Sequence, residues 1–441
     1  MAERAATRRR FYYNIVEVQA LQALAASIIH NVTAYIIHVV GLLISAPALL
    51  HFGAVLFGLA FGQLRLATAA LALALRRASQ READYPQRTW RHYKANADFR
   101  HDFRFDRAHL PRLIRAMRLP ETVTFKGYSF TADEAVSVLL LTLATNATLN
   151  KINQKFGIKR SKASTIMSWS VQVLHDMWYK PLFVTDFRRW TRDFPEWAAA
   201  VCQVQGGDDG TSYRGIVAFV DGTLNPTCRP PPWLQRAFYS GYKKKHGVHW
   251  QGTLALMGLL IDLAGPFEGR HTDKWMLNVS ELTDRLKQAL DWAVDNEGAP
   301  VTWPAGDIYF FGDAGYNRRL QMQVMHAKPP GRELTDAQTR VNLRLSKSRI
   351  ANEWIFGRIG ALWPYVACKT KLKVRVGNVG SVFIVATLLT NALTCLEGSA
   401  TSKYFGLVPP TLEEYFDDAP AAASCPRARY ENVDKYDQVD A

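Results

Sequence analysis

The hydrophobic pattern divides the chain into an apolar beginning and a polar, basic continuation. Residues 39–62 carry no formal charge and form a run that is long enough to cross a bilayer. Pro47, His51 and Arg65 lie within the surrounding apolar block, which equally favours a buried helical hairpin or a non-native extension. We therefore interpret residues 1–81 as an apolar helical extension that contains a candidate membrane segment at 39–62.

Helical periodicity follows once the composition turns polar. Helices are predicted over 132–145, over 149–156 and from Ser161 onward, and Gly157 provides the turn between the second and the third. This spacing is typical of a helix-turn-helix, so we assign residues 82–185 to an all-α domain.

The start of the third predicted helix carries polar residues that fall off its apolar stripe. They could meet DNA phosphates or base edges, and they are Lys159, Arg160, Lys162 and Thr165. The alternative is a plain helical subdomain with a solvated basic face. DNA binding by this helix-turn-helix is therefore a hypothesis.

The pattern changes to strands after residue 215. Continuous apolar runs predict strands over 216–220, 254–261 and 308–311, and helical spacing predicts helices over 274–294, 335–362 and 382–396. Alternating strands and helices predict an α/β layer with a largely buried sheet. We assign residues 186–400 to this domain and residues 401–441 to a polar C-terminal tail.

The charge of the chain favours a polyanionic partner. Lys and Arg number 54 against 39 Asp and Glu, which gives a formal net charge of +15 over 441 residues. Nucleic acid is the first candidate partner and an anionic membrane surface is the second. The five cysteines are far apart and show no CxxC pair, so neither a disulfide framework nor a zinc site is indicated, and a reducing compartment fits best.

Three acids stand where a metal-dependent phosphoryl-transfer site would need them. Asp221 and Asp313 each end a predicted strand, and Glu353 lies on the later helix. Carboxylates suit Mg²⁺ or Mn²⁺, and two such ions can activate a nucleophile and stabilise a leaving oxygen. One turn before Glu353, Arg349 could orient it or touch a phosphate. For a single Asp-Gly a strand-to-turn junction is the simpler interpretation, but the three acids together favour a catalytic site.

Several segments in order resemble the PIF/Harbinger-type DDE transposases and their domesticated nuclease-like relatives. The similarity extends over about 128–397, and its motifs are Val220–Thr223, Tyr239–His246, Gly269–Leu277, Gly312–Tyr316 and Arg349–Gly357. Within them, Lys243, Lys244 and Lys245 are well placed for a phosphate backbone, although a solvated hairpin tip is an equal alternative. A family His-Asp-Ser segment reads Thr272-Asp273-Lys274 here, which leaves Asp273 between a supporting role at the site and helix capping.

The resemblance implies a ribonuclease-H-like catalytic domain whose acidic triad is Asp221, Asp313 and Glu353. It also implies two divalent ions, double-stranded DNA with terminal inverted repeats as substrate, a homo-oligomer, a Myb-like accessory protein and a nuclear location. The apolar extension is not a feature that we associate with this family.

We expect an α/β protein in which an apolar helical segment and a helix-turn-helix domain precede a mixed sheet flanked by helices. The expected activity is metal-dependent cutting and joining of DNA. The alternatives are a domesticated DNA-binding protein without catalysis and a membrane-anchored protein of transposon origin.

Overall fold

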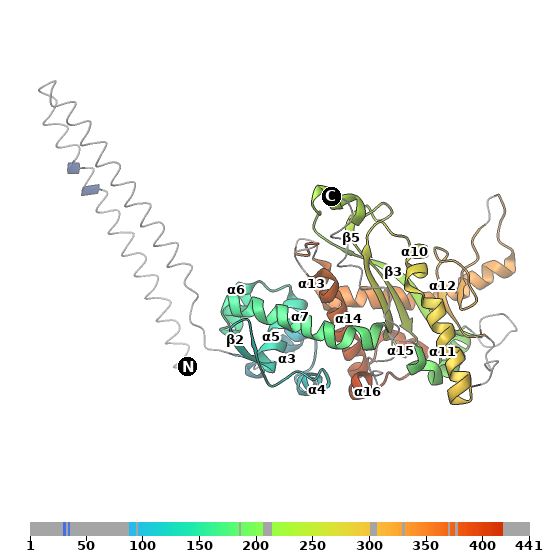
Figure 1. Ribbon diagram of the computed structural model, residues 1–441, viewed down its shortest axis with the longest axis horizontal. Coiled ribbons are helices and arrows are strands. Elements are labelled where there is room, and N and C mark those ends of the chain that lie inside the picture. The colour runs from blue at the N-terminus through green and yellow to red at the C-terminus, as the bar shows by residue number, and fades with distance from the viewer. Residues whose placement is uncertain are drawn as a thin grey trace, which may run out of the picture. The chain divides into compact units, whose positions relative to one another are not determined.

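The computed structural model describes residues 30–31, 34–35, 88–93, 96–184, 187–205, 214–299, 307–328, 331–368, 371–374 and 378–417, and the side chains of 347–353 fall outside this description. The chain divides into two units at Asp84, and the helices and strands described below all belong to the second, Tyr85–Ala441 (Figure 1). The apolar segment 39–62, predicted as a candidate membrane span, lies outside the described residues.

The second unit begins with a helical part. Its elements are η1 (Trp90–His92), α3 (Asn96–Phe103), α4 (His109–Ala116), the hairpin β1 (Thr122–Phe125) with β2 (Tyr128–Thr131), α5 (Ala132–Thr145), α6 (Leu149–Phe156) and α7 (Arg160–Phe183). Thr131 caps α5, because its hydroxyl accepts from the Glu134 N–H while the Glu134 carboxylate accepts from the Thr131 N–H. Gly157 ends α6 in the left-handed region at φ 68° and so makes the turn into α7.

A mixed sheet forms the centre of the same unit. Its strands are β3 (Ile216–Pro226), β4 (Tyr239–Ser240), β5 (Lys245–Ala255), β6 (Leu260–Glu268), β7 (Tyr309–Gly312) and β8 (Met322–Val324). β5 pairs antiparallel with β3, β4 and β6, whereas β7 pairs parallel with β3 and with β8. This sheet, flanked by helices, is consistent with the predicted α/β ribonuclease-H-like fold.

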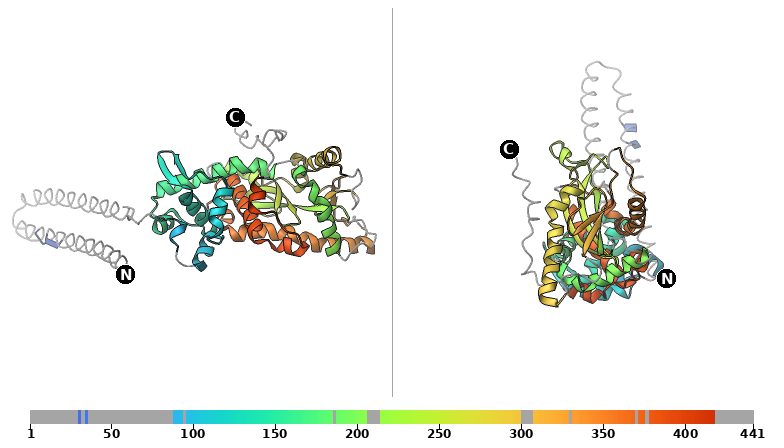
Figure 2. Two further views of the ribbon diagram at one scale, coloured as in Figure 1. Left: turned by 90° about the horizontal axis from the view of Figure 1, so that it is seen from below. Right: turned by 90° about the vertical axis from the view of Figure 1, so that its right-hand side faces the viewer.

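Helices surround the sheet on both faces. They are η2 (Phe187–Asp193), α8 (Phe194–Val204), α9 (Pro232–Phe238), α10 (Asp273–Ser280), α11 (Leu282–Glu297), α12 (Asp336–Leu362), α13 (Pro364–Ala367), α14 (Val379–Glu397), α15 (Ala400–Phe405) and α16 (Leu412–Asp417). α14 packs against α7 and α12, and Figure 2 shows it between these two long helices. α14 is also long and apolar enough to cross a membrane, but most of it is buried in the core of this unit.

Alternation along β5 assigns the helices to faces. Trp250 stacks on Phe383 of α14 at a centroid distance of 5.0 Å, and Gln251 donates from Nε2 to the Ser280 hydroxyl at the end of α10 over 2.8 Å. Successive side chains on a strand point to opposite faces. One face of the sheet therefore meets α14 and the other meets α10.

Four sequence predictions are corrected. Residues 82–185, predicted to be all α, include the antiparallel hairpin of β1 with β2. Residues 254–261 are not one strand but a buried hairpin turn, in which Gly258 takes φ +88° beneath Ser399. The helix predicted over 274–294 breaks at Glu281, which takes φ 50° between α10 and α11. The tail predicted from 401 begins with two packed helices, because short helices can bury Phe405, Leu412 and Phe416 without a long apolar stripe.

Candidate active site

The central strands place two of the predicted acids side by side. β3 and β7 run parallel with Phe219 opposite Phe311, and Asp221 and Asp313 each follow two residues later. β7 ends at Gly312, just before Asp313, whereas β3 continues to Pro226, so Asp221 lies within its strand and not at the strand end predicted from the sequence. It lies where the parallel neighbour β7 stops. Asp221 and Asp313 are both partly exposed there.

Backbone donors hold both carboxylates. The Gly222 N–H donates to Asp221 Oδ1 over 3.0 Å, and the Gly315 N–H donates to Asp313 Oδ1 over 2.8 Å. The Tyr316 N–H donates to the Asp313 carbonyl over 3.2 Å and closes a turn after β7. Such turns fix the direction of an Asp side chain close to its own backbone.

A third carboxylate joins this pair from α10. A Cβ added to Gly222 would lie 2.2 Å from Asp273 Oδ1, and one added to Gly315 would lie 2.9 Å from Asp313 Oδ1 and 3.4 Å from Asp273 Oδ2. Burial raises the pKa of Asp273, the charge of Asp313 raises it further, and the charge of Lys243 opposes both. Two glycines therefore make room for Asp273 beside Asp313, next to the strand that carries Asp221.

Asp273 is the residue that sequence reasoning left undecided. Thr272 is the N-cap of α10 and accepts from the Trp275 N–H, so capping does not require the Asp273 side chain. A usable signal was present in the chain, because Asp273 opens the helix that directly follows β6. A carboxylate in the first turn of a helix lies close to a sheet when the strand just before that helix belongs to the sheet.

Tyr316 is a buried residue next to this cluster. Its ring packs on Gly312, where an added Cβ would lie 2.8 Å from a ring carbon, and the residue is only 4% exposed. Its hydroxyl is buried and has no hydrogen-bond partner among the described residues. Burial, followed by the charges of Asp273, Asp221 and Asp313, raises its pKa well above the usual value. The hydroxyl therefore stays protonated and can donate a hydrogen bond into the cluster.

The long helix α12 passes close to Asp221. Phe356 packs on Gly252, where an added Cβ would lie 2.8 Å from a ring carbon, and Gly252 is paired with Asp221 across β3 and β5. The first half of α12 is fixed by Asn342, which donates to the His326 carbonyl and accepts from its N–H over 2.9 Å each. Glu353 and Arg349 belong to this helix, but their side chains lie outside the described residues.

The predicted DNA-binding residues have different surroundings. Lys243, Lys244 and Lys245 are exposed at the tip of the β4–β5 hairpin, and the charge of Lys243 acts to lower the pKa of Asp273. At the start of α7, Lys159 and Arg160 are exposed and Thr165 is half-buried. Lys162 instead forms an ion pair of 2.8 Å with the buried Glu134.

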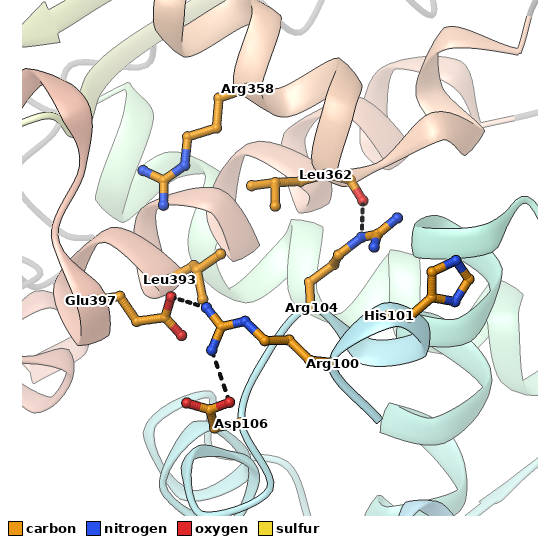
Figure 3. A pocket seen from close by; sticks show the side chains of 8 residues that line it. All are labelled: Arg100, His101, Arg104, Asp106, Arg358, Leu362, Leu393 and Glu397. Carbon is orange, nitrogen blue, oxygen red and sulfur yellow. Dashed lines mark hydrogen bonds and ion pairs between the residues drawn. The ribbon is translucent and has the colours of Figure 1, made fainter. Parts of the chain in front are cut away.

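A separate polar pocket lies between α3, α12 and α14 and has a volume of about 670 Å³ (Figure 3). Ligand atoms of Asp106, His109 and Glu397 lie within 4.8 Å of one another beside it, as in a metal site. However, the Arg100 guanidinium pairs with both Asp106 and Glu397. We therefore interpret this group as an ion-pair cluster that joins α3 to α14.

The comparison with protein families supports a class for this domain. Residues 220–391, less than half of the chain, match the family model of the DDE superfamily endonuclease. A search of the curated proteins and a search of the solved structures found no match. The matched range holds Asp221, Asp273, Asp313 and α12, so fold, site and family model together support a transposase-like nuclease domain of the DDE superfamily.

Proposed function

We propose that this protein is a PIF/Harbinger-type transposase that cuts and joins DNA by two-metal phosphoryl transfer. One observation supports the proposal: Asp221 on β3 and Asp313 just after β7 belong to neighbouring parallel strands, with Asp273 beside Asp313, inside the range that matches the endonuclease family. Carboxylates that approach each other in this way repel unless a cation or a proton lies between them.

The residues present suit divalent cations. Hard oxygen ligands are available from Asp221, Asp273 and Asp313, and Glu353 is a fourth candidate. The Tyr316 hydroxyl has no hydrogen-bond partner among the described residues, so a further polar group could bind there. Bound Mg²⁺ or Mn²⁺ would supply activation of a nucleophile and stabilisation of the leaving oxygen. The carboxylates hold and orient the cations, and the lysines of the hairpin bind the phosphates.

The reaction consists of two steps. In the first, the oxygen of a water bonds to phosphorus and the bond from phosphorus to the 3′ oxygen breaks, which leaves a 3′-hydroxyl and a 5′-phosphate. In the second, the oxygen of that 3′-hydroxyl bonds to a phosphorus of target DNA, the bond from that phosphorus to its own 3′ oxygen breaks, and the displaced oxygen takes up a proton and leaves as a 3′-hydroxyl of the target strand. The Tyr316 hydroxyl has no hydrogen-bond partner among the described residues and would be available as a donor in the first step.

The direct test is nicking of DNA that carries the terminal inverted repeats flanking the gene. We expect cutting with Mg²⁺ or Mn²⁺ and none with EDTA. Mn²⁺ should also raise the unfolding temperature of the parent, because a ligand that binds only the folded state stabilises it. A protein that binds this DNA but cuts it with neither metal would instead be the domesticated, non-catalytic DNA-binding protein.

The basic tip of the hairpin gives a second prediction. Replacing Lys243, Lys244 and Lys245 together by Ala should weaken DNA binding. The slope of the logarithm of the binding constant against the logarithm of the salt concentration should become less steep by about 0.9 for each phosphate that the variant no longer neutralises. The matched control is Lys287→Ala, because Lys287 is an exposed lysine already paired with Asp291 on α11. Equal salt dependence in the triple variant and the parent would remove the hairpin from the DNA surface. Fluorescence anisotropy at several salt concentrations measures both quantities.

The proposal extends to partners and location. A transposase must bring two DNA ends together, so we propose a homo-oligomer. We also propose a Myb-like accessory protein and a nuclear location. Lys159, Arg160 and Thr165 at the start of α7 are proposed to contribute to recognition of the DNA ends.

A further inference from the structure

The segment between the first acid and β6 is strongly one-sided in charge. From Gly222 to Ile261 the sequence contains no Asp or Glu, while it carries Arg229, Arg236 and the three lysines 243–245. Within it, α9, β4 and the hairpin tip form what we call the hairpin module, residues 229–246. A surface of this composition is complementary to a polyanion.

The hairpin module is fixed close to the acids. The Arg270 N–H donates to the Ala237 carbonyl over 3.0 Å, and Gly269 lies so close that an added Cβ would be 2.4 Å from the Phe238 carbonyl oxygen. These contacts attach the end of α9 to the chain only a few residues before Asp273. Lys243 then acts on Asp273 from the hairpin tip. What binds the module therefore lies near the start of α10, which carries Asp273.

Two aromatic side chains of the hairpin module are exposed to solvent. Tyr242 is 87% exposed and Trp233 is 72% exposed, which makes them the two most exposed aromatic side chains in the part of the chain that the structure describes. The Lys243 ammonium lies 5.0 Å from the Tyr242 ring centroid, over one face of the ring. The turn that presents the ring is held by the Ser240 hydroxyl, which accepts from the Lys243 N–H.

We infer that Tyr242 stacks on an unpaired base of the DNA strand next to the cut. Rings on which bases stack accept any base, because every base has a π-face, and flanking cations bind the adjoining phosphates. A second copy of this chain fits the surface less well, since each copy carries a net charge of +15. The inference rests on the proposed function and adds that the substrate carries an unpaired base at the cut.

The experiment measures binding without metal, so that it is independent of cleavage. In EDTA, the full chain is titrated with a DNA duplex that holds one unpaired base and with the fully paired duplex of the same ends. We expect the parent to prefer the unpaired base by about tenfold or more. Tyr242→Ala and Tyr242→Leu should lose this preference, and Tyr242→Phe should keep it because it retains the ring. With 2-aminopurine as the unpaired base, its emission should be quenched by the parent and by Tyr242→Phe only.

The controls separate stacking from charge and from self-association. Lys244→Ala should weaken binding of both duplexes equally and leave their ratio unchanged, whereas a loss of the ratio would assign the preference to charge and overturn the inference. A Tyr242→Ala variant that still prefers the unpaired base would overturn it as well. The inference would also be overturned if sedimentation showed that Tyr242→Ala dissociates into smaller species while its DNA preference stays intact. Metal-dependent nicking by such a protein would leave the proposed function standing.

Discussion

Asp313→Asn should strongly slow metal-dependent DNA cleavage while leaving the fold and DNA binding intact. The Asn side-chain oxygen can still accept from the Gly315 N–H, so the turn after β7 is preserved. The lost negative charge removes one anionic ligand from the cluster. We expect a loss of about 4 kcal/mol in transition-state stabilisation, or roughly 10³-fold in rate. Asp221→Asn should behave in the same way, because its oxygen accepts from the Gly222 N–H.

Cleavage rate, DNA affinity and the rise in unfolding temperature with Mn²⁺ are measured together. Asp284→Asn is the matched control, because Asp284 is an exposed aspartate in the first turn of α11. Asp273→Asn should lower the Mn²⁺ effect as Asp313→Asn does, and Glu353→Gln tests the acid predicted on α12. If Asp221→Asn and Asp313→Asn cut DNA as fast as the parent, the active site lies elsewhere.

The two acids could be predicted from the sequence because short, continuous apolar runs lead into Asp221 and Asp313, although Asp221 does not end its strand, since β3 continues to Pro226. Their proximity could not, since nothing local states that β3 and β7 are neighbours in parallel register. That pairing follows from long-range packing of the helices between them. The same limit hid Asp273, whose place depends on the close approach of α10 to Gly222.

Local sequence patterns also gave wrong predictions where a segment is buried on both sides. The apolar run 254–261 has the composition of a buried strand, yet its middle turns under Ser399 and leaves Leu256 and Leu259 buried on both sides of Gly258. Lys162 has the position of a DNA contact on its helix, but Glu134 on α5 meets it across the helix pair. Helical spacing shows which face a residue occupies, and only the tertiary structure shows what that face meets.

The inward glycine of β3 provides a sharper test of the third carboxylate. In Gly222→Ala, the new methyl would lie 2.2 Å from Asp273 Oδ1 and 3.2 Å from Met276 Cε, which is well inside contact distance for the carboxylate oxygen. Either the carboxylate turns away or α10 shifts, and both outcomes displace Asp273 from Asp313. A displacement of about 1 Å at a catalytic group can cost on the order of 10²-fold in rate, so we expect a loss of that size.

The control and the double variant assign this loss to Asp273. Gly360→Ala on α12 introduces the same methyl where no atom lies within 4 Å, and it should cut DNA like the parent. If Gly222→Ala acts by displacing Asp273, then adding it to Asp273→Ala should cost little more than Asp273→Ala alone, because residues in contact do not contribute additively. Circular dichroism and thermal unfolding in EDTA check that each variant is folded. Additive losses in the double variant would show that Gly222 supports the site through β3 itself, and parental cleavage by Gly222→Ala would remove Asp273 from the reaction.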